Sequence, residues 1–492
     1  MAPDLSLDDF LRLATEHSVV PVARRVLADR ETAVSLFEKL VGDGPGFLFE
    51  SLQGGERWAR WSFVGWDALA TLTSRSGAST FSGTIKLDLP DTDPLSVLEY
   101  VTEQYSTPDL PGLPPLHSGL VGYLGYDCVR YVERLPNGPV DDRGLPEMLW
   151  QFAGTIAAID NLNQEVILIR NVVVGDNPRE QHAEANRHLD EAVRRLGSSA
   201  EYRPTVVESL ESDLDLTNVT STMEQSAFEA GVLRAKEYIV QGEAFQVVLS
   251  QRMAQPFDGK AFEVYRSLRH INPSPYLFFF RDEELSIVGS SPELMTRVRD
   301  GKIYSRPIAG TLPRGATEEE DLAFEQQLLN DPKERAEHVM LIDLARNDVG
   351  RVSEFGSVAV DDLMVIERYS HVMHIVSGVS GVLREGVGPV AALRATFPHG
   401  TVSGAPKVRA MEIIDELEPV ARGPYAGAVG YVDFSGNVDT AICLRTVVIA
   451  DGTAWVQAGG GLVHDSDPTS EYEESMNKAA AALHAVQAAS RL

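Results

Sequence analysis

Alternating hydrophobic and polar positions predict short strands in the first third of the chain. The runs GFLFESL at residues 46–52 and RWSFVGW at residues 60–66 alternate as half-buried strands do. Residues 118–127 (SGLVGYLGYD) read as a strand punctuated by glycines, which often mark bulges or close approach of another backbone. Residues 151–170 predict a hairpin that turns near residues 161–163.

The pattern changes to helical spacing and then to a polar stretch near residue 200. A charged helix is expected from about residue 178 to residue 196, and residues 197–222 are rich in Ser, Thr, Asp and Glu. Apolar residues then recur every three or four positions from residue 228 to residue 239, and Gly242 stands where a glycine ends a helix. A strand is expected at residues 245–251.

These elements favour an α+β fold, because the strands are grouped and do not alternate strictly with helices as in a parallel doubly wound sheet. We expect an N-terminal domain at residues 1–196, a linker at residues 197–222 and a C-terminal domain at residues 223–492.

The composition is that of a soluble globular protein, with 43% hydrophobic and 23% charged residues. The net charge of −29 excludes a global basic surface for nucleic acid. An anionic substrate would therefore need local cations or a metal ion to offset the charge of the protein.

The two cysteines, Cys128 and Cys443, are too few for a disulfide framework and fit a reducing compartment. The first ten residues lack the basic start and apolar core of a signal peptide, and no apolar run approaches the ~20 residues that span a membrane. We expect a cytoplasmic protein without membrane contact.

A helix expected from Ser470 carries Glu471 and Glu474 three positions apart, on one face and in mutual repulsion. Ser470 and Glu473 fit a capping box, which would explain part of the acidity. The second explanation is a metal or catalytic role for the pair.

A second such pair, Glu334 and Glu337, continues at helical spacing into Leu341 and Leu344 and should face the interior. Asp331 and Pro332 predict the start of this helix. Two helices that each direct two carboxylates inward indicate a shared hard cation, Mg²⁺ rather than Zn²⁺. The alternative is ion pairing with nearby cations, which would be Lys333, Arg335 or Lys478.

Several other positions are candidates for ligand contact. Three glycines at residues 459–461 follow an expected strand and predict either an anion-binding loop or a tight turn. Arg445 lies in an apolar strand expected at residues 440–449, where it needs an anionic partner from the protein or a ligand. His374 fits either a packed or a catalytic histidine, and residues 397–407 (FPHGTVSGAPK) predict an ordered loop.

Taken together, these motifs resemble those of the chorismate-utilising enzymes, in order and over nearly the whole length. The chain is most similar to the large subunits that form anthranilate. The motifs that carry the resemblance are LFESL, SGLVGYLGYD, GEAFQVVLSQR, NPSPYLFF, GSSPEL, RPIAGT, AEHVMLIDLARND, FPHGTVSGAPK and GPYAGAVGY. The resemblance implies a two-domain αββα sandwich with large, mainly antiparallel sheets, an N-terminal inhibitor-binding part and a C-terminal chorismate-binding part.

The resemblance also implies the reaction and its residues. Chorismate and ammonia would give anthranilate and pyruvate, with Mg²⁺ bound by Glu337 and Glu474 and supported through water by Glu334 and Glu471. The implied catalytic residues are His374, Glu293, Gln246 and Thr311, with Glu293 as the general acid. The implied substrate-binding residues are Thr401, Tyr425, Arg445, Gly459, Gly460, Gly461, Lys478, Ala309 and Gly310.

Two positions separate the branches of the family. Relatives that add water carry a lysine where this chain has Gln246, and aminodeoxychorismate synthases carry a nucleophilic lysine where it has Ala309. Both residues favour direct addition of ammonia. The alternatives are a relative that stops at 2-amino-2-deoxyisochorismate, an aminodeoxychorismate synthase component I, and a non-catalytic binding protein on the same fold.

The resemblance implies two further partners. No nucleophile-elbow cysteine motif of a glutamine amidotransferase is present, so a separate amidotransferase subunit would supply ammonia in a hetero-oligomer. L-tryptophan would act as a feedback inhibitor. The implied inhibitor site is formed by Glu50, Ser51, Ser62, Pro275 and Tyr276, with Phe49 where the family has leucine.

Overall fold

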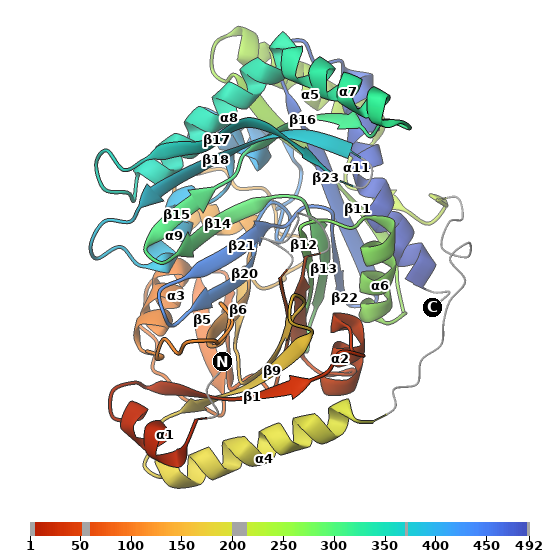
Figure 1. Cartoon of the computed structure of the whole chain (residues 1–492). Helices are drawn as coiled ribbons and strands as arrows, with labels where there is room; N and C mark the ends of the chain where they lie inside the picture. The colour runs from red at the N-terminus through yellow and green to blue at the C-terminus, as the bar shows by residue number, and fades with distance from the viewer. Residues whose placement is uncertain (1–4, 52–59, 199–213, 370–371, 490–492) are drawn as a thin grey trace.

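Two large antiparallel sheets stack face to face, and helices cover their outer faces (Figure 1). The computed structural model describes residues 5–51, 60–198, 214–369 and 372–489. The expected α+β sandwich with mainly antiparallel sheets is confirmed. None of its helices, over these described ranges, is long and apolar enough to cross a bilayer.

The first sheet contains strands from both ends of the chain. Its order is β1 (Val19–Leu27), β9 (Glu165–Val173), β8 (Thr155–Asp160), β3 (Trp61–Trp66), β2 (Gly46–Glu50), β12 (Tyr276–Arg281), β13 (Ser286–Ser291), β22 (Thr446–Ala450), β23 (Thr453–Leu462), β11 (Gln246–Pro256) and β10 (Thr220–Ser221), and β19 (Gly404–Ala405) also pairs with β11. The outer face of this sheet is covered by α1 (Leu7–Leu13), α2 (Ala33–Leu40), α4 (Pro178–Leu196), α5 (Gln225–Val240), α6 (Ala261–Ile271), α10 (Lys407–Leu417) and α11 (Pro468–Ala489).

The second sheet is built in the same way. Its order is β16 (Ile308–Pro313), β18 (Val372–Val382), β15 (Lys302–Ser305), β14 (Leu294–Arg299), β21 (Val438–Ile442), β20 (Ala428–Asp433), β6 (Gly119–Leu124), β7 (Met148–Phe152), β4 (Ala70–Arg75) and β5 (Ala78–Gly83), and β17 (Ala359–Arg368) pairs with β18. The remaining helical segments pack on or beside it: α3 (Pro94–Glu103), η1 (Tyr126–Tyr131), α7 (Glu318–Asn330), α8 (Pro332–Gly350), α9 (Pro389–Thr396) and η3 (Gly400–Val402).

The alternation of side chains along the strands explains why the first sheet has a hydrophobic core on each face, one against the helices and one against the second sheet. Along β12, Leu277 and Phe279 point to the helices, whereas Phe278 and Phe280 point to the second sheet. Both faces of such a strand are buried, so both must be apolar. In β2, Phe47 and Leu48 divide between the two cores in the same way.

The two halves of the chain share both sheets. Strand β2 pairs with β12, and β6 pairs with β20, so N-terminal and C-terminal strands are hydrogen-bonded neighbours. The division at residues 1–196, 197–222 and 223–492 stays a prediction. Most of the predicted linker, residues 199–213, lies outside the described residues, and its end forms β10 against β11.

Four local predictions need correction. The apolar run at residues 440–449 is two strands in different sheets, β21 and β22, separated at Arg445, whose φ is 47°. The three glycines lie inside β23 and pair with β11, so they form neither a loop nor a turn. Helix α11 begins at Pro468, and the Asp467 carboxylate accepts from the Ser470 amide in the capping role predicted for Ser470. Residues 118–127 contain the strand β6 followed by a 3₁₀ turn that starts at Tyr126.

We predict that Phe279→Ala lowers the free energy of unfolding by about 3–5 kcal/mol, because it leaves a cavity in the core under α2 and α6. Phe279 is fully buried, and its ring centroid lies 5.1 Å from that of Phe37 and 5.3 Å from that of Phe262. Urea unfolding would measure the loss. Phe355→Ala is the control and should change stability by about 0.5 kcal/mol at most, because Phe355 is exposed. Equal effects of the two substitutions would contradict the core assignment.

Candidate active site

A cavity of about 290 Å³ is lined by α11, by the segment that follows α6 and by residues at the start of β18. Figure 1 shows α8 lying over β16 and β18, and α11 beside β23. The cavity brings together His374 from β18, Arg445 from the crossing between β21 and β22, and Glu474 and Lys478 from α11. Four residues that the resemblance assigns to one site therefore line the same cavity.

His374 is held by its neighbours in the β16–β18 ladder. It pairs with Thr311, and its Nδ1 lies 2.9 Å from the Thr311 hydroxyl and 3.1 Å from the Gly310 carbonyl oxygen. A carbonyl only accepts hydrogen bonds, so Nδ1 carries the ring proton and Nε2 keeps its lone pair. Burial, aided by the Arg445 charge, lowers the pKa of His374 to about 4. The ring is therefore a neutral imidazole that can accept a proton.

Glu293 has a pKa that is shifted in the opposite direction, so that it holds a proton at neutral pH. It lies between β13 and β14, is 5% exposed, and its Oε2 lies 3.0 Å from the Thr401 hydroxyl oxygen. Burial raises the pKa of Glu293 to about 8, although hydrogen bonds that the Thr401 hydroxyl and the Ile308 backbone N–H would donate to the ionised form oppose this shift. At neutral pH the carboxyl group holds a proton and can donate it. Two titratable groups with pKa values displaced in opposite directions define an acid and a base.

The two Glu-x-x-Glu pairs converge on the glycines of the adjoining strands. A Cβ on Gly310 would lie 3.2 Å from Glu334 Oε2, and a Cβ on Gly460 would lie 3.0 Å from Glu471 Oε2. Burial and then the neighbouring Glu337 raise the pKa of Glu334, and burial raises the pKa of Glu471. Ionisation of Glu334 and Glu471 is therefore disfavoured by burial and by the neighbouring glutamates.

Two of these glutamates have protein partners. Gln246 Nε2 donates to Glu337 Oε1 at 3.0 Å, and Lys478 Nζ lies 2.6 Å from Glu474 Oε1. Within the described ranges, no three His, Cys, Asp or Glu side chains stand close enough to form a finished metal site. The donors are nevertheless all carboxylate oxygens, which is the chemistry that Mg²⁺ takes. The set fits a hard cation that would complete its coordination with water or substrate.

The glycines of β23 are required by close packing. A Cβ on Gly459 would lie 2.1 Å from the Leu249 carbonyl oxygen, and one on Gly461 would lie 2.4 Å from Gln246 Nε2. The strand can therefore carry no side chains here without displacing Gln246 and the glutamates of α11. Lys478 Nζ also donates to the Gly459 carbonyl oxygen at 3.1 Å, which ties α11 to the strand.

The structure leaves Arg445 without a carboxylate partner within 4.0 Å among the described residues. Its Nη1 donates to Asn272 Oδ1 at 3.4 Å, and it lines the cavity beside His374. Burial lowers its pKa, since the charge is poorly solvated. This arrangement suits an anionic ligand group.

Tyr425 and Ala309 are placed less directly. Tyr425 is buried, stacks on Arg422 with 5.6 Å between the guanidinium carbon and the ring centroid, and is absent from the described lining of the cavity. Ala309 is buried in β16 opposite Ile375 of β18. The role of Tyr425 at the substrate stays a prediction.

A second cavity of about 380 Å³ lies between the sheets in the region predicted for the inhibitor. Glu50, Ser51, Pro275 and Tyr276 line it, whereas Ser62 does not and accepts from Asn161 instead. The Glu50 carboxylate already accepts from Arg269 at 2.6 Å and from Tyr265. Its charge is therefore compensated within the protein by Arg269.

Sequence reasoning missed several lining residues. Arg297, Tyr431 and Asp439 line the second cavity, and Asn272 and Tyr369 line the first. Arg297, Tyr431 and Asp439 lie on strands, and Asn272 and Tyr369 follow α6 and β17, at places that only the long-range packing of the chain brings to a cavity. Charged residues in otherwise apolar strands, such as Asp439 in β21, are the one sequence feature that marks some of them.

Comparisons with known proteins agree with this geometry. A family model described as chorismate binding enzyme matches residues 45–484. The anthranilate synthase component 1 of Acetivibrio thermocellus is 44% identical over 491 residues, covering 99% of both chains. That of Mycolicibacterium smegmatis is 47% identical over 513 residues, covering 100% of this chain and 95% of the relative.

Solved structures show the same relationship. Anthranilate synthase component I from Streptococcus pneumoniae aligns with a TM-score of 0.74 and 35% identity, covering 88% of this chain and 95% of that one. The menaquinone-specific isochorismate synthase MenF from Escherichia coli, 19% identical with a TM-score of 0.70 over 98% of this chain and 99% of that one, shares the fold. The chain belongs to the chorismate-binding enzymes and, within them, to the anthranilate synthase component 1 family.

Proposed function

We propose that the chain converts chorismate and ammonia into anthranilate, pyruvate and water. The observation that carries this proposal is a buried carboxyl group with a raised pKa, Glu293, and a buried imidazole with a lowered pKa, His374, both beside Tyr369. The reaction needs both. A hydroxyl group must leave with a proton, and a ring proton must then be removed.

Each step uses one of these groups. Ammonia adds at ring C2 while the C4 hydroxyl leaves, and the proton of Glu293 goes to that hydroxyl, which departs as water. His374 Nε2 then takes the C2 proton, the bond from the ring to the enolpyruvyl oxygen breaks, and the ring becomes aromatic as pyruvate leaves. Thr311 and Gly310 hold the ring of His374 in the tautomer that leaves Nε2 free.

Arg445 and Lys478 are positioned to bind the substrate carboxylates. Arg445 lines the cavity with no carboxylate partner among the described residues, and Lys478 of α11 lines the same cavity. Gln246 and Ala309 favour ammonia addition over the alternatives. The Gln246 amide is engaged with Glu337 and provides no base, and Ala309 provides no nucleophile. Release of 2-amino-2-deoxyisochorismate or of aminodeoxychorismate is therefore the less favoured outcome.

Mg²⁺ is the proposed cofactor, held by Glu337 and Glu474 with Glu334 and Glu471 around it. When bound, the cation offsets the negative charge of the substrate and of the glutamates. Lys478 then exchanges its contact with Glu474 for one with the substrate.

The proposed assembly is a hetero-oligomer in the cytoplasm with a glutamine amidotransferase subunit, which supplies ammonia. Relatives named component 1 support a partner component. Tryptophan is the proposed inhibitor. The 380 Å³ cavity supports this, because its walls combine the aromatic rings of Trp61, Phe63 and Tyr276 with polar groups.

We predict that the purified chain forms fluorescent anthranilate from chorismate, Mg²⁺ and ammonium, with a bell-shaped dependence of kcat on pH. The rate should rise through about pH 4 as His374 becomes neutral and fall through about pH 8 as Glu293 ionises. Glu293→Gln should slow the reaction about 10²–10⁴-fold and remove the alkaline fall. Glutamine should replace ammonium only after an amidotransferase subunit is added. A product with the mass of aminodeoxychorismate would contradict the proposed function.

We predict that Glu334→Gln raises the melting temperature in EDTA at pH 7.5, because the raised pKa of Glu334 makes its ionisation costly to the folded state. That cost is absent below the unfolded pKa of about 4.3, so the gain should vanish as the pH falls. Mg²⁺ should raise the melting temperature of the wild type more than that of the variant. Glu354→Gln, an exposed position, is the control. If the variant is no more stable than the wild type in EDTA, ionised Glu334 does not destabilise the folded state and the claim of repulsion among the glutamates is wrong.

We predict that tryptophan weakens chorismate binding and that chorismate weakens tryptophan binding by the same factor, as linkage requires. Ser51→Phe should relieve inhibition because its ring fills the 380 Å³ cavity, while the KM for chorismate without tryptophan stays unchanged. Calorimetry with and without a chorismate analogue measures both affinities. Wild-type inhibition in Ser51→Phe would exclude this cavity as the inhibitor site.

A further inference from the structure

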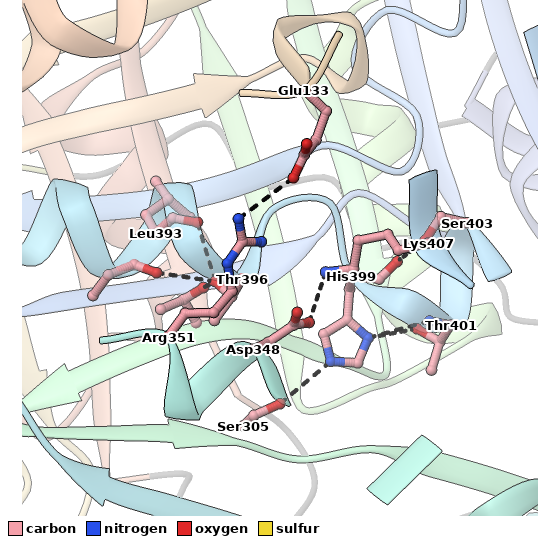
Figure 2. A network of polar contacts seen from close by, with 12 residues as sticks. Glu133, Ser305, Asp348, Arg351, Leu393, Thr396, His399, Thr401, Ser403 and Lys407 are labelled. Atoms are coloured by element: carbon pink, nitrogen blue, oxygen red, sulfur yellow. Dashed lines mark hydrogen bonds and ion pairs between the residues drawn. The ribbon is translucent and has the colours of Figure 1, made fainter. Parts of the chain in front are cut away.

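His399 is a buried histidine that the proposed reaction leaves without a role. It precedes η3, is 4% exposed, and lies in the polar network of Figure 2 with Ser305 on one side and Thr401 on the other. Its Nδ1 lies 3.5 Å from Glu293 Oε1, an oxygen that is buried and has no hydrogen-bond partner within the described parts of the chain. The His399 ring therefore lies next to the carboxyl group of Glu293, the proposed general acid.

The contacts of His399 determine its tautomer. The backbone N–H of Thr401 donates to Nδ1 at 3.4 Å, and a backbone N–H cannot reverse its direction. Nδ1 therefore presents a lone pair, and the ring proton is on Nε2, which lies 3.4 Å from the Ser305 hydroxyl oxygen. Both ring nitrogens then have a partner.

This tautomer makes the Thr401 hydroxyl sensitive to the state of Glu293. Its oxygen lies 2.8 Å from His399 Nδ1 and 3.0 Å from Glu293 Oε2, but it has a single hydrogen. If Oε2 is protonated, Oε2–H donates to Thr401 and Thr401 donates to Nδ1, so every group is satisfied. If Glu293 is ionised, the hydroxyl hydrogen turns to Oε2, and two lone pairs face each other between Thr401 and His399. The network favours the acid.

Burial and, after it, a nearby cation keep the His399 ring neutral. Lys407 on α10 and Asp348 on α8 form a buried ion pair at 2.7 Å, and the pair of Arg351 and Glu133 lies farther out (Figure 2). Burial and then the Lys407 charge lower the pKa of His399 to about 3. The ring therefore stays an acceptor at Nδ1 over the working range of the enzyme.

We propose that His399 is a positioning residue that acts through the Thr401 hydroxyl to hold Glu293 in its protonated, general-acid form. This inference rests on the proposed function for its catalytic meaning. Its physical content, the proton on Glu293, does not depend on turnover.

The test compares two substitutions at one position. His399→Asn keeps an acceptor, Oδ1, near the place of Nδ1, whereas His399→Leu removes it. In His399→Leu, the Thr401 hydroxyl donates to Oε2 whether Glu293 is protonated or ionised. The protonated form then loses the advantage of about one hydrogen bond, which lowers the ratio of protonated to ionised Glu293 about tenfold. The pH at which kcat falls on the alkaline side should decrease by about one unit, with little change in KM. His399→Asn should keep the wild-type limb.

A second readout does not require turnover. The infrared difference spectrum between the wild type and Glu293→Gln should contain the carbonyl stretch of a protonated carboxyl group, and the pH at which it disappears should fall in His399→Leu only. His399→Phe, which keeps the ring volume, replaces Leu if that variant does not fold. An unmoved alkaline limb and infrared titration, whatever the overall rate, would overturn the proposal, as would equal shifts in the Asn and Leu variants. A wild type that forms no anthranilate, yet shows the infrared shift, would refute the proposed reaction and leave the role of His399 intact.

Discussion

Loss of solvation where the two sheets end is the constraint on which the site depends. Apolar strands buried on both faces exclude water, and the same exclusion acts on any titratable group that the strands carry. It raises the pKa of Glu293 to about 8 and lowers that of His374 to about 4. One physical effect thus produces an acid and a base without a nearby charge of opposite sign for either.

The same exclusion of water makes the glutamates of α8 and α11 costly. The protein offsets part of this cost with Lys478 and Gln246, which engage one glutamate each, and glycine at Gly460 leaves space for the carboxylates. A cation and an anionic substrate would complete the compensation. The negative charge of the glutamates is therefore only partly compensated by the protein, whereas the core around Phe279 is closely packed without a ligand.

The sequence was informative where the physics is local. Alternation predicted β2, β3 and the β8–β9 hairpin, and helix α4 has the predicted limits. Periodicity does not specify which sheet a strand joins, so the crossing at Arg445 was missed. Spacing put Glu334 and Glu337 on one face, but only the fold brings α11 to them.

The contacts of single residues were the least predictable. His399 faces Glu293 because β14, α9 and η3 meet in space, and Thr401 is 108 positions from Glu293 in the chain. Similarly, no local pattern indicates that Arg269 compensates the Glu50 carboxylate. These contacts depend on long-range pairing, which leaves no signal in a single sequence.

The most direct test of the central claim is the protonation state of His374 in the resting enzyme. Nitrogen chemical shifts of ¹⁵N-labelled histidine, assigned by comparison with His374→Asn, report both the charge and the tautomer of the ring. Desolvation predicts a neutral ring from pH 5 to pH 8 with the proton on Nδ1, because Nδ1 donates to the Gly310 carbonyl oxygen. A ring that protonates near the ordinary histidine pKa of about 6.5, or one that carries its proton on Nε2, would contradict the account.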